Sequence, residues 1–436
     1  MKKIYYGKKT EAAIRNFPFP ANKVHLELIY GIAEVKKATA IGHYKAGELP
    51  KPYAQAIVQA ADEIIAGKFD EQFVTCAIQG GAGTSIHMNV NEVIAVRATE
   101  IHANGHKIHA NDEVNMGQST NDVNPTALKI VCIRLTQEVL TSLDYVITAF
   151  DDKAKKYKHV RKIGRTHLQD AVPTTIGAEC ASYRDILKRN KKRIKEAQNY
   201  LYDLSLGGTA IGNSVNASEA YMQHTYQELQ RITNLPIKRA KNMMSQTSSS
   251  SDFCQLSAVL NILFTDINKI ANDLRFLASG PYGGIGEISL KELQPGSSIM
   301  PGKVNPIIPE SMNQIAYDIM GKNLTIHQAA TNSYLELSLM FPVMSEAMIT
   351  MLKMSSSGLF VFATHCIQYL KPNEKRCEEL LENSTTYATL FSPQLGYDTV
   401  SKIVKEAVAE QKSFREIVLA KKLLTEENFE EITRPN

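Results

Sequence analysis

Gly296 to Pro306, G-S-S-I-M-P-G-K-V-N-P, is the stretch of the chain that says most about its fold. It combines paired hydroxyls that include Ser297 with a lysine, Lys303, and an amide, Asn305. Its two glycines allow sharp turns and a close approach of the backbone to a ligand. Backbone N–H groups beside a fixed cation bind oxyanions. The stretch therefore predicts a loop that stabilises negative charge on a small acid. The alternative is a surface loop without chemistry, which is the usual role of such a composition.

The composition indicates a globular protein with a large core. The chain has 436 residues, enough for about two or three domains. Its net charge of +4 is a mild excess that fits a small anionic partner. The basic run 188–195 falls in a helical pattern and is interpreted as a solvated face, so no nucleic-acid partner is expected. The six cysteines include no C-x-x-C pair, which indicates reduced thiols without a disulfide framework or zinc site.

The N-terminus and the apolar runs bear on the compartment. Met1 to Gly7 lacks the apolar segment of a secretory signal. No uninterrupted apolar run approaches the ~18 residues needed to span a membrane. We therefore expect a soluble, cytoplasmic protein with no membrane partner.

Long helices dominate the expected fold. Apolar residues recur at steps of three and four through residues 125–159, 175–204, 216–233, 253–278 and, with interruptions, 310–370. The stripe formed by Leu263, Ile267, Ile270, Leu274 and Leu277 is an example. Shorter patterns cover 23–46 and 52–65. Helices of this length predict a mainly α, elongated bundle whose faces pack against neighbouring subunits.

The pattern changes divide the chain into three expected domains. Residues 1–117 form a mixed, mainly helical N-terminal domain, and residues 118–373 form the central bundle of long helices. Lys371-Pro372-Asn373 interrupts the helical pattern, which leaves 374–436 as a small helical C-terminal domain. This last segment is too small for much independent stability and is expected to pack on the bundle.

Three further stretches, rich in small polar groups, are expected to be loops between apolar elements. They are Gly83-Thr84-Ser85, the run Gln118–Asp122 (Q-S-T-N-D) and the run Gly164–Asp170 (G-R-T-H-L-Q-D). Hydroxyl and amide groups of this kind can bind a carboxylate through several neutral hydrogen bonds. Taken alone, however, S-T-N-D indicates a helix cap or Asx turn. A single histidine such as His167 more often indicates a satisfied core residue than a catalyst.

Together these stretches resemble the motif regions of the aspartase/fumarase superfamily, in order. The run 296–306 resembles the signature loop of that superfamily, and the resemblance extends from Tyr5 to the C-terminus. It implies a three-domain fold with a central bundle of long helices. It also implies a homotetramer with a multi-helix core, and chemistry that needs no metal or organic cofactor.

Two branches of the superfamily have to be compared. Gly81–Ser85 (G-A-G-T-S), Gln118–Asn121 (Q-S-T-N) and Val304–Glu310 (V-N-P-I-I-P-E) resemble aspartases. Arg165–Leu168 (R-T-H-L) and Gly207–Ala210 (G-G-T-A) look more like fumarases. The balance favours an aspartate ammonia-lyase. A class II fumarase is the alternative, and a catalytically silent structural paralogue is less favoured.

The resemblance also implies roles for individual residues. L-aspartate would lose a proton from C3 and ammonia from C2, giving fumarate through an aci-carboxylate. Ser297 would be the base, Lys303 and Asn305 would hold one carboxylate, and Glu310 would pair with His167 and raise its pKa. The residues expected to hold the other carboxylate and the amino group are Thr84, Ser119, Thr120, Asn121, Thr166 and His167. In similar proteins the motif regions reach one pocket from different subunits.

Two further features need interpretation. His102, His106 and His109 could suggest a metal, but Asn104-Gly105 interrupts a helix there, and we expect none. The run His109–Asp112 resembles a second anion-binding segment of fumarases. The main departures from the family pattern are His87 where asparagine is usual, Gly212–Asn216, Asn332–Ser338 and Tyr282. His87 is expected to be close enough to Thr84 to touch the substrate.

Overall fold

The structure is a computed structural model that describes residues 3–433. Helices make up most of it, and the sheets in the described residues have two strands each. The chain divides into two compact units. Unit 1 consists of Met1–Leu140, Lys192–Phe264 and Tyr317–Ser356; unit 2 consists of Thr141–Lys191, Thr265–Ala316 and Ser357–Asn436. The three-domain division expected from the sequence follows other boundaries and stays a prediction.

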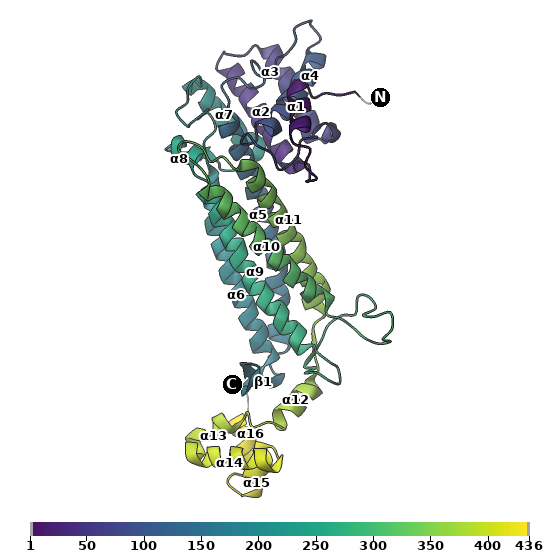
Figure 1. Cartoon of the computed structure of the whole chain (residues 1–436). Helices are drawn as coiled ribbons and strands as arrows, with labels where there is room; N and C mark the ends of the chain where they lie inside the picture. The colour runs from purple at the N-terminus through teal and green to yellow at the C-terminus, as the bar shows by residue number, and fades with distance from the viewer. Residues whose placement is uncertain (1–2, 434–436) are drawn as a thin grey trace. The chain divides into compact units, whose positions relative to one another are not determined.

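The long helices are those that the sequence predicts, with shifted ends (Figure 1). They are α5 (Thr120–Lys156), α6 (Ile176–Asn199), α9 (Ser251–Leu277), α10 (Ile307–Thr331) and α11 (Phe341–Val361). The pattern over 310–370 is interrupted at residues 332–340, between α10 and α11. The stripe on α9 is buried as expected, since Leu263, Ile267 and Ile270 have no exposed surface. The expectation of a mainly α fold with long helices is therefore confirmed.

Unit 1 contains the N-terminal helices, shorter elements from further along the chain, and parts of the long helices. The elements are α1 (Lys8–Asn16), α2 (Leu26–Lys45), α3 (Lys51–Ile65), η1 (Asp70–Gln72), α4 (Thr84–His102), η2 (Tyr200–Tyr202), β3 (Asp203–Leu204), α7 (Glu219–Thr233), β4 (Lys238–Arg239) and α8 (Met243–Ser248). Helix α2 packs on α3 and α7. A Cβ atom on Gly42 would lie 2.1 Å from Thr225 Oγ1, so the close packing of α2 on α7 requires glycine there.

Unit 2 contains a hairpin, parts of the long helices and the C-terminal helices. Its shorter elements are β1 (Arg161–Thr166), β2 (Gln169–Thr175), β5 (Ile288–Ser289), the π-helical η3 (Phe362–Cys366), η4 (Ile367–Tyr369), β6 (Lys371–Pro372), α12 (Glu374–Glu382), α13 (Ala388–Leu395), α14 (Tyr397–Glu410), α15 (Phe414–Ala420) and α16 (Glu426–Thr433). Helices α6 and α9 are joined where Tyr183 donates to Asp273 at 2.8 Å. The C-terminal helices enclose their own core around Phe391, Phe414 and Phe429.

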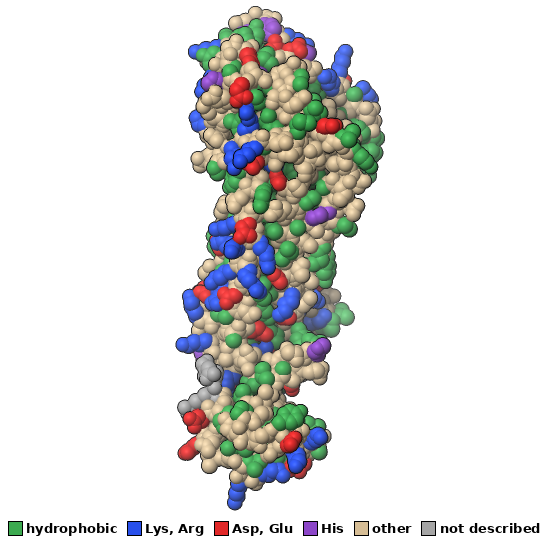
Figure 2. Space-filling model, turned by 90° about the vertical axis from the view of Figure 1, so that its left-hand side faces the viewer, with side chains coloured by type: hydrophobic (Ala, Val, Ile, Leu, Met, Phe, Trp, Pro, Cys, Tyr) green, Lys and Arg blue, Asp and Glu red, His purple; other side chains and the backbone are tan. Residues whose placement is uncertain are grey.

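The charged surface agrees with the interpretation of the basic run. On α6, Leu187, Asn190 and Ile194 are buried, while the lysines and arginines between them are mostly exposed. Lys191 pairs with Asp144, and lysine and arginine side chains are interspersed with acidic ones on the face shown in Figure 2. The run 188–195 is therefore a solvated helix face.

One apolar stretch differs from expectation. Among the described residues, the helical stretch Phe341–Tyr369 is long and apolar enough to cross a membrane. The sequence suggested no apolar run of that length, because small polar residues and two charges, Glu346 and Lys353, interrupt this stretch. However, 56% of the apolar part of this stretch is buried inside the protein, as in a core helix.

Candidate active site

The first motif is a tight turn that opens α4. Gly81 and Gly83 have positive φ angles of 85° and 88°. A Cβ atom at Gly83 would lie 2.7 Å from Asn124 Nδ2 and 3.0 Å from the Phe341 ring, so backbone angle and space both require glycine. Thr84 is the first residue of α4 and donates its hydroxyl to the Gly81 carbonyl at 2.8 Å. It begins a helix, whereas the sequence suggested a loop.

The second motif is the first turn of α5, and its own side chains cap it. The Ser119 N–H donates to Asp122 Oδ1 at 2.9 Å, and the Asn121 N–H donates to Ser119 Oγ at 3.2 Å. Asp122 Oδ2 accepts from the N–H groups of Gly207 and Thr209 at 3.1 and 3.0 Å. The stretch is thus a helix cap, and the same bonds hold Ser119 and Asn121 in place.

A buried acid and a buried base lie beneath the second motif. Asp122 is fully buried, and burial raises its pKa to about 6 against the opposing effects of its N–H donors and of Lys36. Lys36 donates to Asn115 Oδ1 at 2.7 Å and to Gln118 Oε1 at 2.8 Å. Burial lowers the pKa of Lys36 well below its usual value. Sequence analysis identified neither residue as part of this network.

A pocket in unit 1 brings parts of the first two motifs together. Thr120 and Asn121 line it, as does Ala82 from the turn before α4. Asn121 Nδ2 also donates to the Ala210 carbonyl at 2.8 Å. Thr84 and Ser119 lie outside the lining of this pocket. The described part of unit 1 thus gathers some of the expected substrate-binding residues, but not all of them.

Lys129 lines the same pocket and was missed by sequence analysis. Its Nζ donates to Asp252 Oδ2 and Gln246 Oε1, both at 2.6 Å, and to the Asp203 carbonyl at 2.7 Å. Burial lowers the pKa of Lys129, and the nearby Asp252 carboxylate opposes that effect. The sequence did carry a signal, because Lys129 interrupts the apolar run 127–133, A-L-K-I-V-C-I. A lysine in such a run has to find buried partners.

The third motif is the tip of the β1–β2 hairpin. Thr166 pairs with Gln169, which leaves His167 and Leu168 as the two-residue turn. Their φ angles are 53° and 61°, the positive values that match a tight turn to the twist of its strands. Thr166 and His167 are exposed. The tip therefore presents a hydroxyl and an imidazole to solvent in the isolated chain.

Strand β1 of this hairpin is held by a buried ionic cluster. Arg165 donates through both terminal nitrogens to Glu287, at 3.0 and 2.9 Å. Lys162 Nζ lies 3.2 Å from Glu287 Oε2, and Glu287 itself is fully buried. The Asn373 N–H donates to the Glu287 carbonyl at 2.8 Å. The cluster therefore joins the hairpin to the connection between α9 and α10.

The signature loop lies in that connection and is closed by its own backbone. The Gly296 N–H donates to the Lys303 carbonyl at 3.0 Å, and Asn305 Nδ2 donates to the Gly296 carbonyl at 2.8 Å. A Cβ atom on Gly296 would lie 2.1 Å from the Lys303 carbonyl oxygen, which excludes any other residue. Ser297 is half-buried and accepts from the Ile299 N–H at 3.2 Å. Asn305 thus joins the two ends of the loop.

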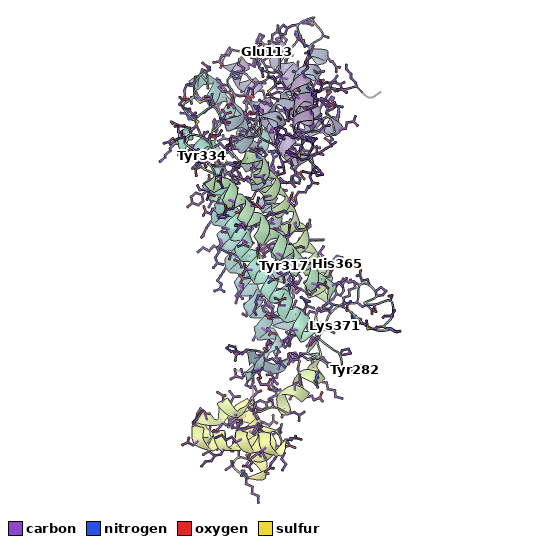
Figure 3. All side chains as sticks on the ribbon, viewed as in Figure 1. Glu113, Tyr282, Tyr317, Tyr334, His365 and Lys371 are labelled. Carbon is purple, nitrogen blue, oxygen red and sulfur yellow. The ribbon has the colours of Figure 1, made fainter. Side chains whose placement is uncertain are left out.

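The remaining predicted residues in and near this loop are exposed. The Lys303 side chain faces solvent, and Glu310 lies in the first turn of α10, also exposed. Within residues 3–433, no hydrogen bond or ion pair joins Glu310 to His167, so their pairing stays a prediction. Tyr282, a departure from the family pattern, is 98% exposed on the same connection (Figure 3).

The predicted site residues are divided between the two units. Unit 1 holds Thr84, Ser119, Thr120 and Asn121; unit 2 holds Thr166, His167, Ser297, Lys303, Asn305 and Glu310. Within unit 2, the Arg165–Glu287 pair connects the hairpin to the segment that carries the loop. The candidate residues of the first two motifs and those of the hairpin and the signature loop therefore lie in different units.

The histidine cluster before α5 has a structural explanation. Helix α4 ends at His102, where Ala103 takes a left-handed conformation. His106 stacks on Tyr53 at 4.5 Å and lies 3.1 Å from Glu113. In the described part of the chain, no group of three or more histidine, cysteine or acidic side chains could hold a metal ion.

His87 does not lie where the sequence suggested. Its ring is 1% exposed and packs towards α5, with Nδ1 3.0 Å from Thr120 Oγ1. The expectation that it could touch the substrate beside Thr84 is wrong, because His87, the fourth residue of α4, faces the core while Thr84 faces solvent.

Comparisons with known proteins agree with this combination of helices and motifs. Residues 2–321 match a family described as Lyase, and residues 388–436 match the C-terminal region of fumarase C. Aspartate ammonia-lyase of Bacillus subtilis is 42% identical, and the match covers 99% of this chain and 92% of the Bacillus chain. Class II fumarate hydratase of Thermus aquaticus is 39% identical over 99% of this chain and 94% of its own. A Brucella melitensis crystal structure described as fumarate lyase:delta crystallin has a TM-score of 0.94 at 39% identity, covering 99% and 95% of the two chains.

These matches define the class of protein as a lyase. The chain belongs to the aspartase/fumarase superfamily, as its motifs indicated. Aspartate ammonia-lyases and class II fumarate hydratases match it at similar identity.

Proposed function

We propose that this protein is an aspartate ammonia-lyase, which converts L-aspartate reversibly to fumarate and ammonia. The observation that carries the proposal is the sequence around the signature loop, where V-N-P-I-I-P-E at 304–310 follows the aspartase pattern. The motifs at 81–85 and 118–121 support it, as does the 42% identity to the Bacillus subtilis enzyme.

The chemistry asks mainly for electrostatic stabilisation. Ser297, as an alkoxide, takes the proton from C3 of L-aspartate, and the released electron pair makes the adjacent carboxylate an aci-carboxylate dianion. Collapse of this dianion forms the C2–C3 double bond as the C2–N bond breaks and ammonia leaves. Donors preorganised where the second charge develops lower the barrier of such a step. Lys303 and loop N–H groups would stabilise the serine oxyanion.

The other residues hold the substrate in this proposal. Lys303 and Asn305 bind one carboxylate. The second carboxylate and the amino group are bound by Thr84, Ser119, Thr120, Asn121, Thr166 and His167. Glu310 pairs with His167 and favours its charged form. Since Asn305 already donates to Gly296, it would contact the substrate through its remaining N–H or reposition as the loop closes.

The protein is proposed to act as a homotetramer whose sites combine residues of different subunits. Two variants with impaired activity, S297A from unit 2 and T120V from unit 1, test this directly. If each site takes these positions from different chains, mixed tetramers should recover up to about a quarter of the wild-type activity. Mixtures that stay inactive, although mass spectrometry shows hybrid tetramers, would contradict the shared site.

A class II fumarase is the second candidate, because Arg165–Leu168 and Gly207–Ala210 resemble fumarases and the Thermus aquaticus enzyme is 39% identical. Fumarate absorbance after separate addition of L-aspartate and L-malate decides between the two. We expect fumarate from L-aspartate. Fumarate from L-malate alone would overturn the aspartase proposal. If neither substrate is converted, the silent paralogue is favoured. The presence of Ser297, Lys303 and His167 argues against that outcome.

A further inference from the structure

His87 is a buried polar residue with a single recorded hydrogen bond. It lies on α4, where its ring is 1% exposed. The only hydrogen-bond partner found for it within residues 3–433 is the hydroxyl of Thr120, 3.0 Å from Nδ1. Its Nε2 is buried without any partner. Burying a histidine with a single hydrogen bond costs free energy of folding. This cost suggests that the contact with Thr120 has a role.

Thr120 connects the buried His87 ring with the pocket of unit 1. It is half-buried in the first turn of α5 and lines the pocket of unit 1, and its hydroxyl is in contact with His87. A threonine hydroxyl has one hydrogen to donate and can accept as well. The direction of the bond with His87 therefore decides what Thr120 can offer to a ligand in the pocket.

The two neutral forms of the ring have opposite consequences. With the hydrogen on Nδ1, the imidazole donates to Thr120 Oγ1, and the hydroxyl hydrogen is free to point into the pocket. With the hydrogen on Nε2, Nδ1 accepts the hydroxyl hydrogen, and Thr120 shows only lone pairs to the pocket. The second form also leaves a buried N–H without an acceptor, and such orphaned donors are rare in folded proteins. The first form satisfies the ring's only donor.

A charged ring does not arise in this environment. Burial lowers the pKa of His87 well below its usual value, and the positive charge of Lys36 lowers it further. The fully buried Asp122 is on α5, two residues after Thr120, but its carboxylate oxygens are occupied by the Ser119, Gly207 and Thr209 N–H groups. The ring is therefore neutral, with one N–H to place.

We propose that His87 is a positioning residue for a substrate carboxylate: its Nδ1–H donates to Thr120 Oγ1, and this orients the Thr120 hydroxyl hydrogen towards the ligand. The inference rests on the proposed function in one respect only, that Thr120 binds a carboxylate of the substrate. It applies equally to L-aspartate, L-malate and their common product fumarate. His87 thus acts through Thr120 and does not itself contact the ligand.

Fumarate binding to the wild type and to five variants of the full-length protein, measured by calorimetry, tests this role. H87L removes the donor and is expected to raise the fumarate Kd about tenfold, the effect of losing one aligned hydrogen bond to a charged group. H87N keeps a donor close to the position of Nδ1 and should stay within about threefold of wild type. In the T120V background, H87L should add nothing. I94A, which removes buried side-chain volume elsewhere on α4, should lower the melting temperature and leave the Kd unchanged.

The outcomes separate this inference from the proposed function. If T120V leaves fumarate binding unchanged, the proposed substrate site is wrong and the role of His87 falls with it. If T120V weakens binding while H87L does not, only the role of His87 is overturned. Equal losses in H87N and H87L would show a packing effect and overturn it as well. Should H87L fail to fold, neutron diffraction of the wild type decides, because a hydrogen on Nε2 contradicts the proposal.

Discussion

The guanidinium of Arg165 lies side by side with the carboxylate of Glu287, and two hydrogen bonds of 3.0 and 2.9 Å join them. Arg165 immediately precedes Thr166 and His167 at the hairpin tip, and Glu287 lies on the connection that leads to Ser297. Lys162 completes the cluster at 3.2 Å. One buried carboxylate therefore holds strand β1 of the hairpin to the segment that carries the signature loop.

Replacing Glu287 by alanine should destabilise the protein strongly. The change leaves two cations, Lys162 and Arg165, without their shared partner in a buried site, which costs about 3–5 kcal/mol. The free energy of unfolding from urea denaturation measures the loss. The matched control is E378A, because Glu378 pairs with Arg161 on the same strand but is 46% exposed, and such pairs contribute under about 1 kcal/mol. Similar losses in the two variants would contradict the role of the buried cluster.

Ser297→Ala should leave a folded protein and reduce turnover of L-aspartate at least ~10³-fold, because the proposed base is lost. The steady rate of fumarate formation measures this, and circular dichroism checks the fold. Ser298→Ala is the matched control, since Ser298 is the exposed neighbour in the same loop and has no proposed role. Substantial activity in S297A would remove Ser297 as the base.

Lys303→Ala should weaken binding of the substrate carboxylate. A charge-assisted hydrogen bond in a closed site contributes about 1.5–3 kcal/mol, so KM for L-aspartate should rise about 10- to 100-fold. A lysine on the same connection provides the control: Lys291 lies over the ring of Tyr369 at 4.0 Å, and K291A should leave KM unchanged. Unaltered kcat and KM in K303A would show that Lys303 lies away from the substrate.

Asp122 should give the protein a distinctive dependence of stability on pH. Its pKa in the folded protein is raised to about 6 from 3.8 by burial, so between these values the native state holds a proton that the unfolded state has released. The contribution of Asp122 to stability is therefore largest at low pH and falls as the pH rises from about 4 to 6, by about 3 kcal/mol.

Asp122→Asn removes this titration. As the pH rises from about 4 to 6, the difference in unfolding free energy between the wild type and D122N should shift in favour of D122N. Above about pH 6 the difference should stay constant. Urea denaturation at several pH values measures the difference. A difference that stays flat from pH 4 to 6, or grows in favour of the wild type, would show that the Asp122 carboxyl is ionised throughout.

Sequence patterns identified the long helices because burial along a helix repeats with the turn. The stripe from Leu263 to Leu277 on α9 shows this, since its positions are all buried. Helix ends were less accurate, because caps such as Ser218, which accepts from the Tyr221 N–H, depend on side-chain geometry. The polar network around Lys36 and Asp122 was missed, since its partners lie on α2, α5 and the segment 207–209 and share no local pattern.

What the sequence determined by itself is the family, the helical fold class and the identity of the polar motifs, because these depend on residue type and on spacing along one chain. Only the tertiary structure decided that Thr84 begins a helix, that His167 occupies a hairpin turn, and that the His87 side chain lies against Thr120. The last of these is a contact between residues distant in sequence. These features follow from packing and from the need of each buried polar group for a partner, which no local pattern records.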